Sequence, residues 1–311
     1  MRNAFADELT KCAVEDSRIV LLSGDIGNRL FDDYKSRNPG RFFNCGVAEA
    51  NMMSMAAGMA LSGLRPITYT ITPFTTARCF EQIKVDVSFH NLPVTIVGIG
   101  SGLSYAELGA THHSNDDIAL LRILPNMSVI CPADSYEVRA ALRAVLKQDG
   151  PAYIRLGKKG EPVVHEGIPE FTIGKGIVMK EGKDVCLLST GNMLPVVMGA
   201  AARLDEHQIS SQVVSFHTVK PLDSELLKRV FSDFSVVATI EEHGILGGFG
   251  SSVSEWLVGK ENMKASLLCL GVSDTFFCEA GKQEYARHCF GLTDTGIAKS
   301  TMEFFLRKTQ K

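Results

Sequence analysis

Short apolar runs rich in β-branched residues alternate with helical patterns along the chain. In the first half, the runs at 18–25, 65–74, 93–100, 127–133 and 151–157 are apolar at nearly every position, and helical stretches lie at 47–62, 77–89, 115–123 and 134–148. Strands that are apolar throughout are typical of a mostly parallel sheet with helices on both faces. This half therefore predicts a doubly wound α/β domain.

A second alternation follows a stretch that has no hydrophobic period. Residues 158–176 are rich in Gly, Pro and charge, which indicates a linker with at most one short hairpin. Beyond it, strands are expected at 184–190, 210–221, 235–243 and 265–273, with helices near 192–206, 222–231, 249–259 and 294–307. The pattern thus predicts two doubly wound α/β domains, at 1–157 and 174–311, joined by a linker at 158–173.

Composition narrows the class of protein. Of the 311 residues, 45% are hydrophobic and 22% are charged, and the net charge is −3 without a basic run. Nucleic acids and anionic membranes are therefore not expected as partners. The sequence contains neither a membrane-spanning apolar stretch nor a signal-peptide pattern, and its eight cysteines lack metal-ligand spacing. We expect a cytoplasmic protein with reduced thiols and no metal site of its own.

Glu49 is a carboxylate in an apolar setting. It opens a helical stretch rich in Met and Ala, in RFFNCGVAEANMMSMAAGMALSG at 41–63, whose composition predicts that most helix faces are buried. Because burial disfavours the charged form, a glutamate held there can donate a proton near neutral pH. The alternative is a solvent-exposed glutamate that complements the positive end of the helix dipole. The spacing alone leaves both interpretations open.

Several motifs occur in the order of a known family. They are SGDIG (23–27), NCGVAEANMM (44–53), PFTTARCFEQI (73–83), GATHHSNDDIALLR (109–122), GPAYIRLGK (150–158), LLSTGN (187–192), VKPLD (219–223) and EEHGILGGFGSSVSE (241–255). Together they resemble the C-terminal half of transketolase, and the separate small (β) subunit of split transketolases most of all. The resemblance implies a pyrimidine-binding domain followed by the transketolase C-terminal domain.

The resemblance also implies a cofactor and a partner. Transketolases bind thiamine diphosphate between two domains, and the diphosphate-binding domain carries a GDG followed by an Asn-rich segment that binds metal. Neither occurs in this sequence. The expected partner is therefore a diphosphate-binding α subunit that brings Mg²⁺, in an α₂β₂ assembly. A lone β chain should then expose an apolar surface and be poorly soluble.

Family motifs suggest roles for individual residues. Glu49 matches the glutamate that hydrogen-bonds the cofactor pyrimidine and thereby promotes loss of its reactive proton. Phe74 matches the aromatic residue that stacks on the pyrimidine, and Asp25 and Ile26 match an Asp-Leu pair beside the cofactor. Each has a structural alternative: a core Phe for Phe74 and a loop-capping Asp for Asp25.

Other motif residues point to the substrate. His112 matches a catalytic histidine that contacts the sugar oxygens, and His113 replaces a Gln in the same loop. Arg155 aligns with an arginine that binds a substrate phosphate, which suits the bidentate fork of a guanidinium. The alternative for Arg155 is an interdomain salt bridge, and His243 is expected to be structural or at a subunit contact.

Two departures from the family concern the substrate. Transketolases have a His and an Asp at the places that are Gly100 and Leu108 here. The His helps to bind the substrate phosphate and the Asp contacts the C2 hydroxyl of the donor. Their absence predicts a modified substrate, such as a deoxygenated, branched or unphosphorylated sugar.

Three functions are compatible with these motifs. The first is transfer of a two-carbon ketol unit from a ketose donor to an aldehyde acceptor. The second is a β subunit of a 2-oxoacid dehydrogenase or of a decarboxylating carboligase, although those typically lack the THH–SNDD arrangement and the YIRLGK ending. The third is a non-catalytic pseudo-subunit, which the presence of Glu49 and Phe74 disfavours.

Overall fold

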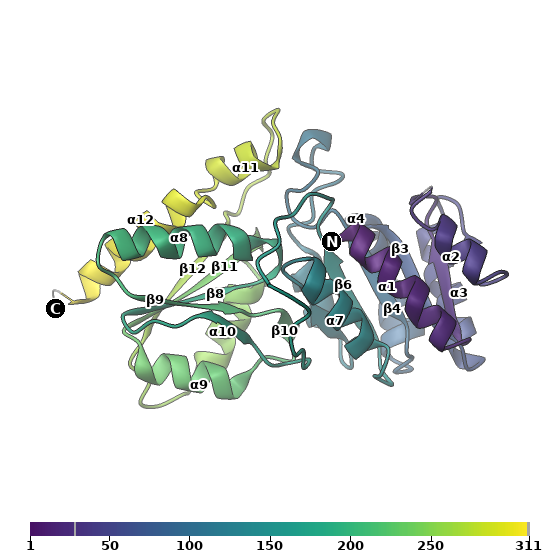
Figure 1. Cartoon of the computed structure of the whole chain (residues 1–311), viewed down its shortest axis with the longest axis horizontal. Helices are drawn as coiled ribbons and strands as arrows, with labels where there is room; N and C mark the ends of the chain where they lie inside the picture. Colours follow the sequence, from purple (N-terminus) through teal and green to yellow (C-terminus); the bar gives the residue numbers. More distant parts are fainter. Residues whose placement is uncertain (28, 310–311) are drawn as a thin grey trace.

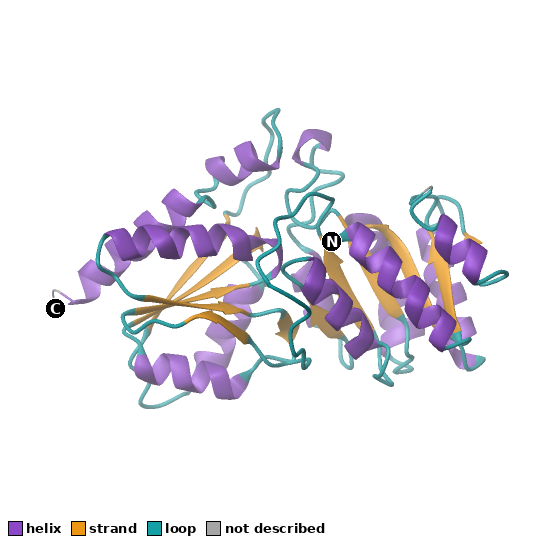
Figure 2. Cartoon of the chain, viewed as in Figure 1, coloured by secondary structure: helices purple, strands orange, loops and turns teal. Residues whose placement is uncertain are grey.

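The computed structural model describes residues 1–27 and 29–309. Two α/β domains lie side by side, each a central sheet with helices on both faces (Figures 1 and 2). The predicted fold class, two doubly wound domains with mostly parallel sheets, is confirmed. No helix within the described ranges is long and apolar enough to cross a membrane.

The first sheet has seven strands. Their order is β10 (Thr218–Lys220), β5 (Ser128–Ile130), β6 (Ala152–Leu156), β4 (Thr95–Ile99), β3 (Arg65–Ile71), β1 (Ile19–Ser23) and β2 (Phe42–Asn44). All neighbouring strands run parallel except the edge strand β10, which is antiparallel to β5. Because β10 comes from the second half of the chain, both halves contribute to this sheet.

Alternate side chains of β1 point to opposite faces of this sheet. Ile19 and Leu21 of β1 belong to a core with the helices α1 (Arg2–Glu15) and α7 (Ser135–Val145). Val20 and Leu22 belong to a second core with α3 (Glu49–Leu61) and α6 (Asp117–Arg122). The sequence shows an unbroken apolar run because both faces are buried. A short helix, α2 (Asp32–Arg37), packs beside α1.

The segment after β3 departs from the single helix expected at 77–89. It folds as four short pieces, which are α4 (Thr72–Thr75), η1 (Ala77–Cys79), α5 (Phe80–Gln82) and the π-helix η2 (Ile83–Ser88). Irregular helical turns of this kind often occur at functional sites. They place Phe74 and Arg78 directly after the end of β3.

The second sheet has five strands. Their order is β12 (Ser266–Val272), β11 (Val236–Gly244), β8 (Val185–Ser189), β9 (Ser211–Ser215) and β7 (Ile177–Lys180). Only the edge strand β7 runs antiparallel to its neighbour. The helices α8 (Leu194–Glu206) and α12 (Asp294–Thr309) cover one face, and α9 (Ser224–Asp233) and α10 (Phe249–Leu257) cover the other (Figure 1).

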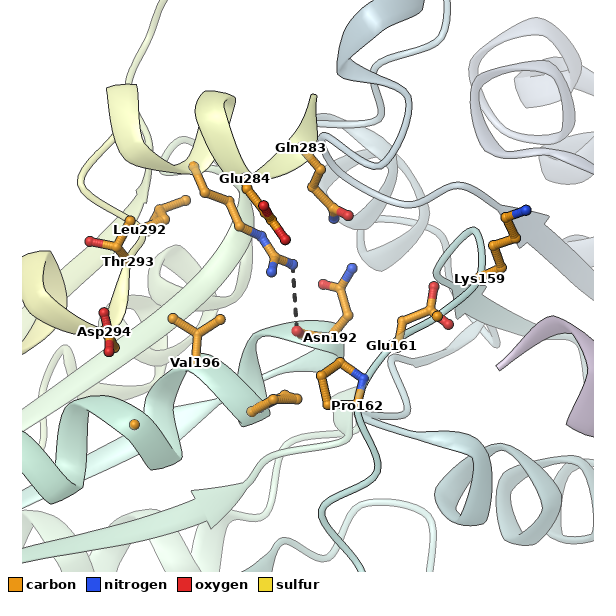
Figure 3. A pocket seen from close by; sticks show the side chains of 14 residues that line it. Lys159, Glu161, Pro162, Asn192, Val196, Gln283, Glu284, Leu292, Thr293 and Asp294 are labelled. Carbon is orange, nitrogen blue, oxygen red and sulfur yellow. Dashed lines mark hydrogen bonds between the residues drawn. The ribbon is translucent and has the colours of Figure 1, made fainter. Parts of the chain in front are cut away.

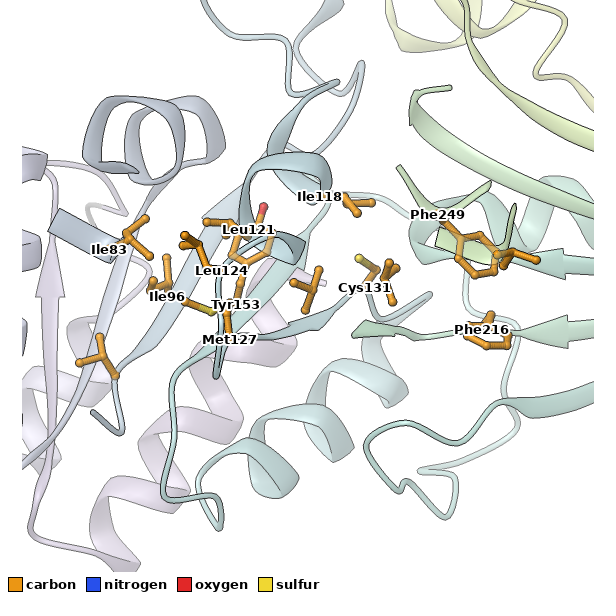
Figure 4. Packing of buried hydrophobic residues seen from close by; sticks show 14 of the residues in the cluster. Ile83, Ile96, Ile118, Leu121, Leu124, Met127, Cys131, Tyr153, Phe216 and Phe249 are labelled. Atoms are coloured by element: carbon orange, nitrogen blue, oxygen red, sulfur yellow. The ribbon is translucent and has the colours of Figure 1, made fainter. Parts of the chain in front are cut away.

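The two domains share a hydrophobic core. Ile118 and Cys131 of the first domain belong to the same buried cluster as Phe216 and Phe249 of the second (Figure 4). Residues 158–173 contain no strand, so this linker lacks the short hairpin that the sequence allowed. These residues pack on both domains. Among them, the Phe171 ring stacks on the His217 ring, with centroids 3.8 Å apart. The domain limits at 157 and 174 stay a prediction.

Candidate active site

The carboxyl edge of the first sheet carries most of the residues singled out by their motifs. Asp25 follows β1, Phe74 follows β3, and the loop with His112 follows β4. Glu49 begins α3, the helix that follows β2. Since ligands of open α/β sheets bind at the carboxyl ends of the strands, this edge is the candidate active site.

Glu49 is buried and is paired with a cation. Its side chain is 2% exposed, and its Oε2 accepts a hydrogen bond of 2.8 Å from Nη1 of Arg78, whose side chain is 45% exposed. The solvent-exposed alternative for Glu49 is therefore wrong. The rest of α3 is less buried than its composition suggested, because Met55 and Leu61 are exposed.

Phe74 lies beside the same cation. The guanidinium carbon of Arg78 is 4.2 Å from the centroid of the half-buried Phe74 ring. Glu49, Arg78 and Phe74 thus form one cluster. Sequence reasoning missed Arg78, although a cation shortly after Phe74 in a helical pattern was an available signal.

The space next to Glu49 is narrow and polar. A Cβ added at Gly24 would lie 2.8 Å from Oγ1 of Thr70 and 3.3 Å from Cγ of Glu49, so only glycine fits between them. Thr70 Oγ1 is buried and has no hydrogen-bond partner among the described residues. A buried acid, a half-buried aromatic ring and an unpaired hydroxyl fit a flat ring that carries donors and acceptors.

Asp25 and Ile26 follow Gly24 in the turn after β1. Asp25 is exposed, adopts φ +57°, and its Oδ1 accepts a hydrogen bond of 2.9 Å from Nδ2 of Asn44. Ile26 is half-buried, and its carbonyl accepts a hydrogen bond of 2.7 Å from the Ser23 hydroxyl. The turn is therefore fixed locally, with the Asp25 carboxylate at the surface.

The two histidines of the following loop point to different places. The His112 ring lies 5.2 Å from the Phe74 ring and 6.1 Å from the Tyr105 ring, and burial lowers the pKa of His112. His113 is buried, contacts the carbonyl of Ala106 through Nε2 at 3.2 Å, and faces Phe277 of the second domain. The structure brings His112, but not His113, to Phe74.

Arg155 lies away from this edge cluster. It is 2% exposed, and its Nε donates a hydrogen bond of 2.7 Å to the buried carboxylate of Asp117. Its Nη2 donates to the carbonyls of Ser114 and Glu242, each at 2.9 Å. These contacts favour the interdomain alternative for Arg155, and its assignment to a substrate phosphate stays a prediction.

Steric crowding explains why position 100, a histidine in the family, is a glycine in this chain. A Cβ at Gly100 would lie 2.0 Å from the Tyr105 ring, so this ring fills the space that a side chain at position 100 would need. Nζ of Lys158 lies 4.6 Å above the same ring and 2.6 Å from Oε1 of Glu107. Leu108 beside them is 50% exposed. Tyr105 stands in none of the family motifs, and Lys158 ends the motif at 150–158, in which only Arg155 was given a role.

The ranges 1–27 and 29–309 contain no group of three or more His, Cys, Asp or Glu side chains that could hold a metal ion. The eight cysteines are free, and three of them, Cys269, Cys278 and Cys289, are exposed.

Both domains match the models of known protein families. Residues 1–161 match the model of the transketolase pyrimidine-binding domain, and residues 174–297 match that of the transketolase C-terminal domain. The fold and the edge cluster thus define a two-domain subunit of the transketolase type. The chain belongs to the transketolase family.

Three relatives cover nearly the whole chain. A 6-deoxy-6-sulfo-D-fructose transketolase subunit from a Clostridium species is 37% identical, across 99% of this chain and 95% of that protein. One of the subunits of the apulose-4-phosphate transketolase from Phocaeicola vulgatus is 32% identical, across 97% and 96%. A solved split-gene transketolase, described as an inactive β₄ tetramer, is 34% identical with a TM-score of 0.89, across 99% and 98%. These relatives are separate subunits, which agrees with the predicted split architecture.

Proposed function

We propose that this chain is the β subunit of a split, thiamine-diphosphate-dependent transketolase. It transfers a two-carbon ketol unit from a ketose to an aldehyde and is active only with an α subunit. The observation that supports this proposal most is the buried carboxylate of Glu49, which Arg78 joins to the Phe74 ring at the carboxyl edge of the first sheet. Membership of the transketolase family supports the same cofactor.

Each residue of the cluster has a separate task in this proposal. When bound, thiamine diphosphate supplies the electron sink that makes cleavage next to a carbonyl possible. Glu49 holds a proton at a ring nitrogen of the pyrimidine, and Phe74 stacks on that ring. Asp25 and Ile26 lie beside the cofactor, and His112 hydrogen-bonds the sugar oxygens. The apolar floor under α3 excludes water, which strengthens each of these contacts.

The substrate in this proposal is a non-standard sugar with a terminal anionic group. Relatives at 37% and 32% identity are named for a sulfonated deoxysugar and for apulose 4-phosphate. Lys158 lies above the Tyr105 ring, which is 6.1 Å from the His112 ring, and we assign Lys158 the sulfonate or phosphate. Leu108, at the place of the family Asp, suits a donor with a different hydroxyl pattern.

The α subunit in this proposal holds the diphosphate and Mg²⁺, and two copies of each subunit form an α₂β₂ enzyme. Subunits of related split enzymes support a partner of this kind. We place the enzyme in the cytoplasm, where exposed thiols such as Cys269 and Cys278 stay reduced.

Reconstitution with the α subunit tests the proposal. Glu49→Gln is expected to lower ketol transfer by about 10²–10⁴-fold, the usual contribution of a positioned acid. Glu255→Gln, a change at an exposed carboxylate of the second domain, is the matched control. Unchanged turnover in Glu49→Gln would support a pseudo-subunit, and release of carbon dioxide from pyruvate would support the decarboxylating alternative.

A further inference from the structure

The loop at 101–114, between β4 and α6, is closed at its base. The Ser114 amide donates a hydrogen bond of 2.9 Å to the Gly102 carbonyl, which forms an isolated antiparallel bridge. Between these ends the loop carries Tyr105, Leu108 and His112, including the short helix η3 (Ala106–Leu108). The position of His112 at the edge cluster therefore depends on how this base is held.

Glu242 of the second domain reaches the base of the loop. It lies in β11 and is fully buried, and its Oε1 accepts a hydrogen bond of 2.7 Å from the Leu103 amide. Two side chains of α11 (Gln283–Cys289) hold the same carboxylate. Gln283 donates through Nε2 at 2.9 and 3.1 Å, and Arg287 donates through Nε to Oε2.

Gln283 and Arg287 both line a pocket of about 540 Å³ together with Asn192. Figure 3 shows Gln283 and Asn192 in this pocket. Gln283 also donates to the Ser104 hydroxyl at 3.2 Å, a second contact with the loop. The α11 side chains therefore fix the Glu242 carboxylate and touch the loop directly.

Arg155 links the backbone of Glu242 to the other end of the loop. Nη2 of Arg155 donates both to the Glu242 carbonyl and to the Ser114 carbonyl, each at 2.9 Å. Gly102 lies against the same residue, because a Cβ there would come within 2.5 Å of both the carbonyl and Oε1 of Glu242. Glu242 thus contacts the start of the loop directly, and Arg155 joins its carbonyl to the end of the loop.

We propose that Glu242 is a positioning residue for ketol transfer, acting from the C-terminal domain. By fixing the start of the 101–114 loop directly and its end through Arg155, it holds His112 opposite Phe74, where the ring centroids are 5.2 Å apart. This inference rests on the proposed function for its effect on catalysis. The neighbouring buried carboxylate has another task, since Glu241 accepts hydrogen bonds from the Phe249 and Gly250 amides at the start of α10.

The experiment compares Glu242→Ala, Glu242→Gln and Gly102→Ala with the control Glu241→Ala. Turnover and cofactor affinity are measured on the reconstituted enzyme, and hydrogen exchange is measured on the full chain alone. Glu242→Ala is expected to lower kcat by about 10²-fold, as misplacement of a catalytic group does, with a cofactor Kd within about twofold of wild type. Exchange at Leu103 should rise by about tenfold or more, the loss expected for one charged hydrogen bond.

Glu242→Gln should restore part of kcat, because its amide oxygen still accepts from the Leu103 amide. Gly102→Ala should also speed exchange in the loop, because the added methyl group disturbs the same contact from the loop rather than from Glu242. This variant keeps the test valid if Glu242→Ala does not fold. Normal exchange and kcat in folded Glu242 variants would overturn the inference, as would an equal effect of Glu241→Ala on the loop. If the wild-type enzyme transfers no ketol unit, the proposed function fails, whereas the exchange result still decides the role of Glu242.

Discussion

Nη1 of Arg78 lies 2.8 Å from Oε2 of Glu49, and the same guanidinium lies over the Phe74 ring. One flat cation therefore contacts the two groups that we assign to the flat pyrimidine of the cofactor. We expect the guanidinium to leave both when the cofactor binds, and the 45% exposure of the Arg78 side chain gives it room to turn outward.

Arg78→Met is accordingly expected to tighten binding of thiamine diphosphate. An ion pair with a half-exposed partner is worth up to about 1 kcal/mol, which corresponds to at most about a fivefold lower Kd. Titration calorimetry on the reconstituted enzyme measures this change, with Lys228→Met on the exposed side of α9 as the control. Weaker binding in Arg78→Met would mean that Arg78 contacts the bound cofactor instead.

Lys158→Met is expected to raise KM for substrates with a terminal phosphate or sulfonate. The loss of one charged hydrogen bond costs about 1.5–3 kcal/mol, or roughly 10–100-fold in KM. A sugar without the anionic group should be affected little, and Lys158→Arg should retain most of the affinity. Lys159→Met is the matched control, because Lys159 lines the pocket under α11 rather than the edge cluster. Equal losses for charged and uncharged sugars would exclude Lys158 as the anion-binding residue.

The sequence predicted the two sheets because their central strands are buried on both faces and read as apolar runs. The strands β2 and β7 gave no such signal, since they are short and partly exposed. The run at 210–221 reads as one strand but divides into β9 and β10, which lie in different sheets.

The candidate site was only partly predictable for a related reason. Glu49, Phe74 and His112 stand in recognisable motifs. The contacts of Arg78 with Glu49 and of Lys158 with Tyr105 join segments that are far apart in the chain. Arg155 has the right residue type for a phosphate site, but its buried partner Asp117 is visible only in three dimensions.

The exposed apolar side chains around α3 predict a subunit contact. Leu61 of α3 and Phe89 after the π-helix are 68% and 78% exposed, and Val47 before α3 is 74% exposed. Burying one large apolar side chain is worth about 1.5–3 kcal/mol. Leu61→Glu with Phe89→Glu should therefore weaken association with the α subunit at least tenfold in sedimentation experiments. Val258→Glu, at a position 81% exposed in the second domain, should have no effect, and equal weakening by both changes would exclude this face.

The buried carboxyl of Glu137 predicts a pH-dependent stability. Burial raises the pKa of Glu137 to about 7, while its Oε2 accepts from the Ala133 amide at 2.7 Å and its Oε1 accepts from the Ser215 hydroxyl at 2.5 Å. His165 lies 3.4 Å from Oε1, and although burial acts to lower the pKa of His165, its hydrogen bond with Asp134 raises it. Between pH 4.5 and 7 the folded protein therefore holds a proton on Glu137 that the unfolded chain has released.

The sign of the effect follows from that proton. The contribution of Glu137 to the free energy of unfolding is fully present below about pH 4.5 and is lost as the pH rises through about 7. Over this range the free energy of unfolding falls by at most about 1.4 kcal/mol per pH unit. Glu137→Gln removes this titration, and its amide can donate to Ser215 while accepting from the Ala133 amide. In urea unfolding at pH 5, 6, 7 and 8, the free energy of unfolding of the variant should therefore rise relative to that of wild type as the pH rises.

Glu241 provides the matched comparison, since burial also raises its pKa to about 7. Both of its oxygens accept backbone amides, from Phe249 at 2.6 Å and Gly250 at 2.8 Å. In Glu241→Gln, the side-chain amide group would therefore place a donor against one of these backbone donors. This variant should be less stable than Glu137→Gln at every pH, while its stability loses the same slope with pH. Stability curves for Glu137→Gln and wild type that stay parallel from pH 5 to 8 would show that Glu137 is already ionised in the folded protein.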